Sequence, residues 1–415
     1  MAMRGVDIYI VSVVNVYPES PRAAVSLAHP LTGRPGFFGR WRTMAAIGLK
    51  MMFHDRLKLA GTLFGVVFAV VLGNFQAGTF LALLAKNRMF VENAQADIWV
   101  TPPGTRQFQG GKPLTDAQLN RARATAGVAW AEPLVLQTAQ LQLPNGGSEP
   151  ISLVGARAPR YVGGPWNLVR GTTEALDQPN AVIFEDSERE KFGGLNLGSV
   201  REVSGHKVQV AGFTWGLLPF APAYAFAEQG LAREILKAPA DQHTFLMVGV
   251  APGADPAEVR ARLQQELPET KVMTRDEYLH EILAYILTAT QIGLSFGTST
   301  LMGLLVGLIT VALSMFSSVI DNMRQFGTLK AIGATNADLT RLLFVQAVLY
   351  GLIGSLMGLG MVAAMVRGMR NPQLTPILPL EAFGISVVVM VAVCIAASVL
   401  ALLRLRKLEP AMVFR

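Results

Sequence analysis

Few residues in this chain have the types and spacing that chemistry requires. The string Gly110-Gly111-Lys112-Pro113 is the nearest approach to a phosphate-binding loop. It lacks the upstream glycine and the Ser or Thr of such loops, and its proline blocks a helix start. The five histidines form no His-x-x-x-His pair, and the single cysteine, Cys394, is expected to be an inert packing residue inside an apolar segment. The sequence therefore predicts a chain that is not an enzyme, with no ATP hydrolysis of its own, no zinc site and no internal disulfide.

One cluster of ionisable residues, Asp276, Glu277, His280 and Glu281, precedes the second apolar segment. It could form a proton or metal site. Alternatively, it is the solvated first turn of a helix, where acidic residues also interact favourably with the helix dipole. We favour the second interpretation because helix starts commonly carry acidic residues. The apolar segments hold almost no charge, and proton-driven transporters need ionisable residues at membrane depth, so the energy source is expected to lie elsewhere.

The positions of the apolar segments are the strongest signal in the chain. A helix that crosses a bilayer needs about 20 apolar residues. Four segments exceed this length, at residues 57–84, 284–320, 342–366 and 380–403. A long stretch of ordinary globular composition separates the first from the second. The predicted fold class is a membrane protein of four transmembrane helices in a one-plus-three arrangement, with a large α+β extracytoplasmic domain between the first two spans.

Basic residues flank the spans instead of forming one patch, so the formal charge of +7 does not indicate nucleic-acid binding. The loop between the second and third spans is basic, as are the regions before the first span and after the fourth. Basic short loops stay in the cytoplasm. Both termini are therefore predicted to be cytoplasmic, and the large domain to lie on the other side of the membrane.

The first two apolar runs are longer than a membrane is thick, which predicts stalks that project outward.

The first 43 residues are interpreted either as a disordered tail or as an extension upstream of the true start of the protein, which would then be Met44. A signal peptide at 8–17 is disfavoured because the stretch lacks a clear cleavage site. The predicted boundaries are 1–43 for the tail, 44–56 for a cytoplasmic amphipathic helix, 57–86 for span 1 and its stalk, 87–280 for the extracytoplasmic domain, 281–321 for the stalk and span 2, 322–341 for a cytoplasmic loop segment, 342–366 for span 3, 378–403 for span 4 and 404–415 for the cytoplasmic tail.

Strands and helices alternate in the domain between the first two spans. The expected strands are at 96–100, 130–143, 244–250 and 271–273, and the expected helices at 115–125 and 255–266. Two strand-helix-strand units of this kind predict a split βαβ layer. An inserted subdomain is predicted at about 155–240, with a hairpin that turns at Ser204-Gly205. Thr274 is predicted to begin a helix that runs without a break into the second span.

A short amphipathic helix is predicted in the loop between the second and third spans. Its apolar side chains recur about every three residues and form one stripe, at Met323, Phe326, Leu329 and Ile332. Gly333 fits a helix end, and Thr335 with Asp338 fits a capping box at the start of the next helix. Such a helix can lie on the membrane or insert into a partner's groove.

The string Arg324-Gln325-Phe326-Gly327-Thr328-Leu329-Lys330-Ala331-Ile332-Gly333-Ala334-Thr335 resembles the coupling segment of the MacB/FtsX superfamily of ABC permeases, also called type VII. The ending Leu408-Glu409-Pro410-Ala411-Met412-Val413-Phe414-Arg415 is similar to the tail of that family. The one-plus-three topology and the split outer domain also match. Within the superfamily, the strings at 49–59 and 74–78 look most like the DevC branch.

The resemblance implies a permease subunit of a bacterial inner-membrane exporter that acts by mechanotransmission. MacB carries its ATPase in the same chain, and this chain carries none, so a separate dimeric ABC ATPase is implied, which would bind ATP and magnesium. The resemblance also implies a homodimer of this chain in membrane lipid, a periplasmic membrane-fusion protein and an outer-membrane channel. The residues that it assigns to ATPase coupling are Met323, Arg324, Phe326, Leu329, Lys330, Ile332, Gly333 and Ala334.

Several glycines lie four residues apart within the spans, a spacing that lets helices approach closely in lipid. Gly61 with Gly65 and Gly354 with Gly358 are two such pairs, although any single pair can arise by chance in glycine-rich segments. Since the resemblance implies a homodimer, we take the pairs in the second span as candidates for helix packing or dimer contact. These are Gly293, Gly297, Gly303 and Gly307.

Three functions stay open at this point. The first is export driven by a separate ATPase. The second is FtsX-like regulation of cell-wall hydrolases, and the third is Lol-like extraction of lipoproteins or lipids. The large two-part outer domain favours export, because the outer domain of the FtsX branch is generally smaller. The sequence does not indicate the cargo.

Overall fold

The computed structural model of the chain describes residues 48–50, 52–53, 55–105, 111–217, 222–288, 291–321, 327–328, 335–369 and 375–405. They fall into two compact units. The helical unit consists of the described residues within 1–74, 300–363 and 379–415, and the mixed unit of those within 75–299 and 364–378. The predicted fold class of four membrane helices and a large α+β domain is confirmed. The predicted tail at 1–43 lies outside the described residues.

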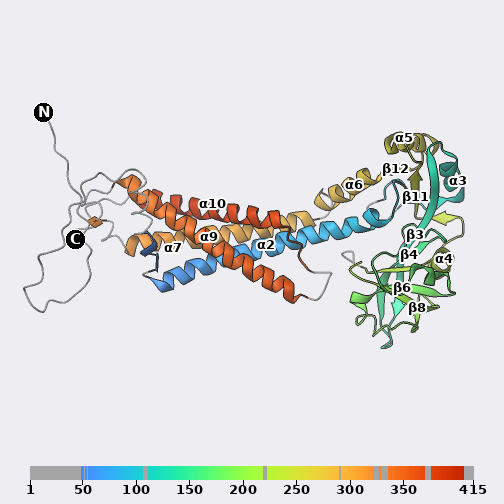
Figure 1. Ribbon diagram of the computed structural model, residues 1–415, viewed down its shortest axis with the longest axis horizontal. Coiled ribbons are helices and arrows are strands. Elements are labelled where there is room, and N and C mark those ends of the chain that lie inside the picture. The colour runs from blue at the N-terminus through green and yellow to red at the C-terminus, as the bar shows by residue number, and fades with distance from the viewer. Residues whose placement is uncertain are drawn as a thin grey trace, which may run out of the picture. The chain divides into compact units, whose positions relative to one another are not determined.

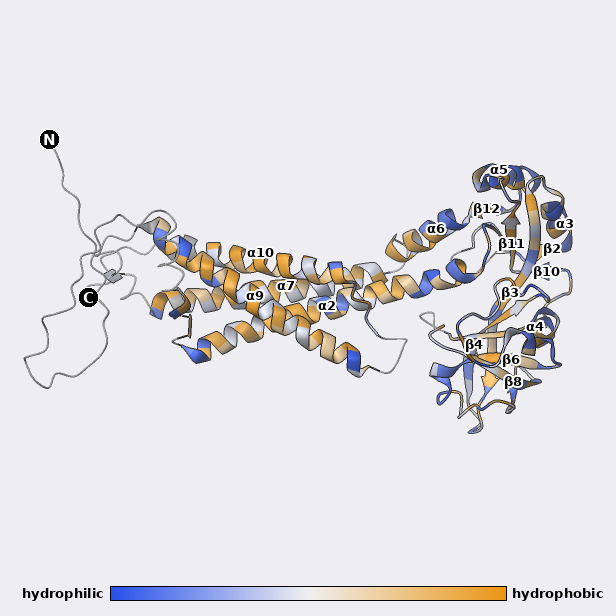
Figure 2. Ribbon diagram, in the orientation of Figure 1, coloured by the Kyte–Doolittle hydropathy of each residue, from blue (hydrophilic) through white to orange (hydrophobic). Residues whose placement is uncertain are grey.

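Among the described residues, four helices are long and apolar enough to cross a membrane: α2 (Arg56–Asn93), α7 (Ile292–Asp321), α9 (Asn336–Gly368) and α10 (Leu380–Leu405). Figure 2 colours them mostly as hydrophobic, whereas the strands and helices of the mixed unit alternate in character. The 38 residues of α2 extend about 57 Å at the rise of an α-helix. A hydrocarbon core is about 30 Å thick, so α2 is longer than the membrane is thick. It ends at Asn93, beyond the predicted end at residue 86.

The prediction of one unbroken helix from Thr274 into the second span is wrong. The structure has two helices here, because α6 covers Arg275–Thr288 and α7 begins at Ile292. A Cβ added at Gly293 would lie 3.3 Å from the backbone oxygen of Leu287. In a continuous helix, residues six apart are separated by about 9 Å along the axis, so this approach requires a break. No glycine or proline occurs in residues 275–292, and the break therefore has no strong local signal.

The mixed unit contains a ten-stranded sheet within the described residues, in the order β12-β1-β11-β3-β4-β9-β6-β8-β5, with β7 beside β3 and β8 (Figure 1). A separate two-stranded sheet pairs β10 with β2. The elements are β1 (Ile98–Thr101), β2 (Leu114–Thr115), α3 (Asp116–Ala124), β3 (Val128–Gln142), β4 (Ser148–Ala156), β5 (Leu168–Arg170), β6 (Ala181–Glu185), β7 (Val200–Val203), β8 (His206–Thr214), β9 (Tyr224–Glu228), α4 (Gln229–Leu236), β10 (Gln242–His243), β11 (Phe245–Val250), α5 (Pro256–Glu266), β12 (Lys271–Thr274) and α6.

One half of the sheet is a split βαβ layer. Its strands run β12-β1-β11-β3 with antiparallel neighbours, and α3 and α5 each connect strands that are not neighbours. Thr115 forms a capping box with Gln118 at the start of α3, and the Asp255 carboxylate caps α5 by accepting from the Ala257 amide at 3.0 Å. These local hydrogen bonds explain why the sequence placed both helix starts correctly.

The inserted part continues the same sheet through one long strand. The first half of the 15-residue β3 pairs with β11, and its second half pairs with β4, whose other neighbour is β9. The predicted turn at Ser204-Gly205 connects β7 to β8, with Ser204 at φ 45° and Gly205 at φ 91°. Both values lie in the left-handed region that glycine adopts without strain. Because β3 pairs with strands of both halves, it connects the insertion to the βαβ layer.

The two faces of the βαβ layer pack against different helices. Ile98 and Val100 pack with the apolar residues of α3 and α5 on one face. Trp99, which points the other way because strand side chains alternate, packs with Phe90 at the end of α2 and with Tyr278 of α6. Its ring centroid lies 6.1 Å from that of Phe90 and 5.4 Å from that of Tyr278. The ends of α2 and α6 are thus part of the core of this domain.

Candidate functional site: the helix bundle beside the coupling segment

Close packing between α2 and α7 depends on small residues. A Cβ added at Gly307 would lie 2.7 Å from the Cβ of Ala69, and one at Gly65 would overlap the side chain of Thr310. Along these contacts the residue numbers increase on α2 and decrease on α7, so the two helices are antiparallel. Without room for side chains at these positions, the backbones can approach closely, as in lipid-embedded helix pairs generally.

A second stripe on α2 contacts α9. A Cβ at Gly354 would overlap Val66, and one at Gly358 would lie 2.7 Å from Cγ1 of Val70. Along these contacts the residue numbers increase on both helices, so α9 is parallel to α2. Successive positions of α2 therefore contact two different neighbours, α7 and α9.

Polar contacts connect α2 to its neighbours along the bundle. The Lys58 ammonium pairs with the Asp321 carboxylate at the end of α7, and it lies 3.1 Å from Oδ2 of Asp55. Farther along α2, the hydroxyl of Thr62 contacts that of Ser314. Asn74 donates from Nδ2 to the Ser386 hydroxyl of α10 at 2.7 Å. Hydrogen bonds of this kind hold helices in register where water is absent.

The start of α9 is fixed by a capping box, as the sequence predicted. The Thr335 amide donates to the Asp338 carboxylate at 3.0 Å, and the Asp338 amide donates to the Thr335 hydroxyl at 3.3 Å. One turn later, Arg341 pairs with Asp338 at 3.2 Å. Gln346 of α9 donates to the Gly48 carbonyl at 3.1 Å, which places the start of α9 next to the segment before α2.

The end of α7, the start of α2 and the start of α9 therefore lie at the same end of the bundle. The predicted coupling segment, at 322–341, directly follows Asp321 and contains the Thr335–Asp338 capping box. Its assigned residues lie outside the described part of the chain, and so their contacts stay predictions: Met323, Arg324, Phe326, Leu329, Lys330, Ile332, Gly333 and Ala334.

The four glycines singled out in the second span have different surroundings. Gly303 and Gly307 face α2 of the same chain, since a Cβ on Gly303 would lie 3.2 Å from Cδ2 of Leu72. Gly293 lies at the α6–α7 break. Gly297 has open space where its Cβ would point. Of the four, Gly297 is the one that remains available to a second protomer.

The acidic cluster before the second span has structural partners. Glu277 accepts from the Thr274 amide at 2.8 Å and pairs with Arg260 at 3.3 Å, and Glu281 pairs with Lys271. Among the described residues, no group of His, Cys, Asp or Glu has the arrangement to hold a metal ion. These contacts support the interpretation as a helix start. Cys394 is fully buried among apolar side chains of the bundle, which agrees with a packing role.

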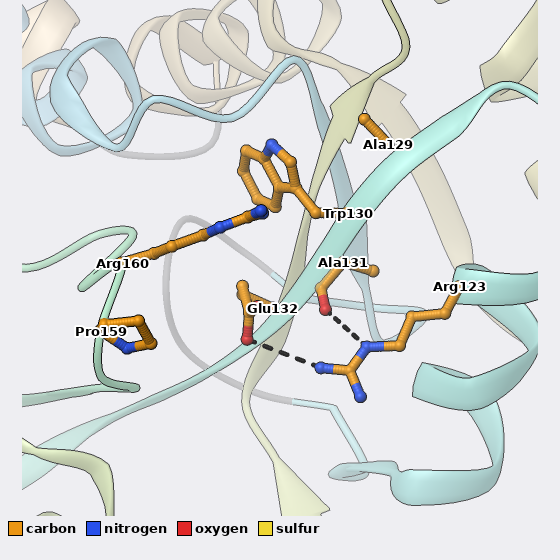
Figure 3. Close-up of a pocket in the computed structure, with 7 residues that line it drawn as sticks. All are labelled: Arg123, Ala129, Trp130, Ala131, Glu132, Pro159 and Arg160. Carbon is orange, nitrogen blue, oxygen red and sulfur yellow. Dashed lines mark hydrogen bonds and ion pairs between the residues drawn. The ribbon is translucent and has the colours of Figure 1, made fainter.

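A shallow cleft of about 400 Å³ lies in the mixed unit between the end of α3, the start of β3 and the segment after β4. Figure 3 shows Arg160 reaching toward Trp130, with its guanidinium carbon 5.8 Å from the ring centroid. Arg123 donates to the Ala131 carbonyl at 2.9 Å and lies 3.6 Å from the Glu132 carboxylate. The cleft offers guanidinium groups and a carboxylate, and no nucleophile among its lining residues.

Sequence reasoning missed the partner of Lys58. The sequence shows only that the region at the start of the first span is basic, and nothing local identifies Asp321, 263 positions later, as the partner of Lys58. The pairing of Asn74 with Ser386 was missed for the same reason. An isolated asparagine inside an apolar run was the available signal, because such residues seek a partner in lipid.

Two family models match the chain. Residues 59–266, half of the chain, match the MacB-like periplasmic core domain, and residues 297–410 match the FtsX-like permease C-terminal region. No curated protein gives a significant sequence match.

Three solved structures are similar in part. They are the extracellular domain of the noncanonic ABC-type transporter YknZ from Gram-positive bacteria (14% identity, TM-score 0.32, 43% of this chain and 98% of that chain), the periplasmic region of MacB from Actinobacillus actinomycetemcomitans (12%, 0.36, 46% and 94%) and a domain of a putative permease protein from Porphyromonas gingivalis (14%, 0.31, 44% and 90%). The matched domains, together with the four membrane helices, show that the chain belongs to the MacB/FtsX-type permease family of ABC transporters.

Proposed function

We propose that this chain is the transmembrane subunit of an exporter driven by a separate cytoplasmic ATPase. ATP binding and hydrolysis in that partner move the coupling segment. The bundle passes the movement to the extracytoplasmic domain, which acts on cargo outside the membrane. Two copies of the chain work with two ATPase subunits, and a periplasmic membrane-fusion protein and an outer-membrane channel receive the cargo, as in the DevC-like branch.

The observation that carries this proposal is the continuity of α2. Its first half packs against α7 and α9 beside the coupling segment, and its last residues belong to the aromatic core of the extracytoplasmic domain. A continuous helix can transmit displacement along its axis because backbone hydrogen bonds connect each turn to the next. The second connection, through α7 and α6, is broken near Gln291. We therefore assign transmission to α2.

The test is a break in α2 at an exposed position. Ala85→Pro removes the hydrogen bond from residue 85 to residue 81 and costs about 3 kcal/mol or more of helix stability, whereas Ala85→Gly costs about 1 kcal/mol and keeps the bond. Purified chain is reconstituted with its ATPase, and hydrogen exchange of the extracytoplasmic domain is compared with and without trapped nucleotide.

The wild type and Ala85→Gly should show nucleotide-dependent exchange in the domain, and Ala85→Pro should lose it while still binding the ATPase. A nucleotide response that persists in the proline variant would contradict transmission through α2. ATP hydrolysis by the purified chain alone would contradict the separate ATPase.

Export, hydrolase regulation and lipoprotein extraction differ in what the extracytoplasmic domain binds. Full-length chain in nanodiscs is tested against a membrane-fusion protein, a hydrolase activator and a lipoprotein from the same organism. The proposal expects the fusion protein to bind. Selective binding of either other partner would replace export with the corresponding function.

A further inference from the structure

His243 is a fully buried histidine at the junction of the two parts of the extracytoplasmic domain. Its side chain has 0% exposure. It lies on β10, which pairs with β2 immediately before α3, and two residues later the chain enters β11 of the βαβ layer. On the other side, α4 belongs to the inserted part and packs through Ala232 and Ile235 on the sheet of that part.

Both ring nitrogens of His243 have partners from different helices. Nη2 of Arg233 on α4 lies 2.7 Å from Nδ1, and Oδ1 of Asp116 at the start of α3 lies 2.9 Å from Nε2. A guanidinium has donors and no acceptor. Nδ1 must therefore accept from Arg233, and Nε2 must carry the proton that is donated to Asp116. This arrangement requires the neutral ring with a single tautomer.

Protonation of Nδ1 would place an N–H against the N–H of Arg233. Two donors and two positive charges would then face each other at hydrogen-bond distance, and one must move away. The bond to Asp116 would survive, since Nε2 keeps its proton and the ion pair becomes stronger. The α4 contact is therefore the one that a proton breaks.

The other charged groups around the ring act in both directions. Arg157, from the segment after β4, opposes a positive ring, as Arg233 does, while Asp116 favours it. Glu228 and Asp241 act on Arg233 and partly balance its charge. Burial is the largest effect, and it lowers the pKa of His243 below the ordinary value of 6.5. The neutral ring is thus the form that the folded domain selects.

We propose that His243 is a proton-operated latch. In its neutral form it joins α4 of the inserted part to α3 of the βαβ layer, and a proton on Nδ1 releases Arg233 and opens that link. The latch gives the extracytoplasmic domain a sensitivity to the pH outside the cytoplasm. It does not rest on the export function.

The direction of the pH dependence follows from the lowered pKa. Above about pH 6.5 the ring is neutral whether the latch is closed or open, so the latch is independent of pH. As the pH falls from about 6.5 toward the lowered pKa, the His243 ring becomes protonated in the open form and stays neutral in the closed form. The open fraction should rise by up to about tenfold per pH unit in that window.

The experiment measures hydrogen exchange of peptides that cover 229–243 in the full-length chain in nanodiscs, from pH 7.5 to 5.5, with peptides of α5 as an internal reference. In the wild type, exchange relative to α5 should accelerate below pH ~6.5, by up to about tenfold per pH unit. His243→Gln should abolish this acceleration, because its amide can accept from Arg233 and donate to Asp116 but does not titrate. His206→Gln, on the β7–β8 hairpin away from this junction, should retain it.

A second measurement does not depend on the folding of the His243→Gln variant. Nitrogen-15 NMR of histidine-labelled wild-type chain should show a ring with an unprotonated Nδ1 that titrates below the ordinary histidine pKa of 6.5, and Arg233→Gln should raise its titration midpoint. A buried ring with Nδ1 protonated at pH 7.5 would overturn the proposal. So would exchange of 229–243 that follows α5 at every pH.

Discussion

The ammonium of Lys58, in the first turn of α2, pairs with the carboxylate of Asp321, the last residue of α7. Both side chains are partly exposed, at 35% and 48%, so this ion pair contributes little to stability. Its position is what distinguishes it. The predicted coupling segment begins at the residue after Asp321, so under the proposed function this contact is a direct route from that segment to α2.

The ion pair should therefore matter more for coupling than for folding. Lys58→Glu and Asp321→Lys should each reduce the stimulation of the partner ATPase by this chain, with little change in thermal stability, because like charges then face each other. The double variant should recover most of the stimulation. Arg56→Glu, which makes the same charge change in the same turn, serves as the control, and a double variant no better than the single ones would show that the contact is incidental.

Gly354 should tolerate no side chain. Its added Cβ would overlap Val66 of α2, so Gly354→Leu should destabilise the bundle by about 1–3 kcal/mol through overpacking. Gly360, on the same helix, has open space at the corresponding point, and Gly360→Leu should leave the melting temperature of the purified chain nearly unchanged. Equal losses for the two variants would contradict the packing argument, because Leu has a higher helix propensity than Gly at both positions.

The open side of Gly297 predicts where two protomers meet. In a background with Cys394→Ala, Gly297→Cys should form a disulfide-linked dimer in membranes after mild oxidation. Gly307→Cys should not, because that position faces Ala69 of its own chain. Gel electrophoresis without reductant reads the result. Dimer formation at residue 307 and not at 297 would place the protomer interface on a different face of α7.

The charge pattern predicts the orientation of the chain in the membrane. A cysteine at Asn145, in the exposed turn between β3 and β4, should react in spheroplasts with a thiol reagent that cannot cross the membrane. One at Thr335, before α9, should react only after the membrane is permeabilised. Cys394 is buried and should give little background. The reverse labelling pattern would place the coupling segment outside the cytoplasm and exclude its contact with an ATPase.

Local signals account for the parts of the fold that were predicted well. The capping residues Thr115 and Asp255 and the turn at Ser204-Gly205 each act through neighbours within a few positions, and the structure has all of them where expected. The sequence did not predict the break between α6 and α7, because residues 275–292 contain no proline or glycine. Nor could the spacing of Gly303 and Gly307 reveal that these glycines pack within one chain, because the same spacing serves contacts between chains.

The sequence by itself determined that the chain has four membrane helices and a large domain after the first, since apolar length, flanking charge and caps are properties of contiguous residues. It also determined the family, through the coupling segment and its surroundings. The tertiary structure alone decided which residues meet. Lys58 and Asp321 lie 263 positions apart, and His243 and Asp116 lie 127 apart. A contact across such a separation depends on how helices and strands pack, and no periodicity within either segment encodes the identity of the partner.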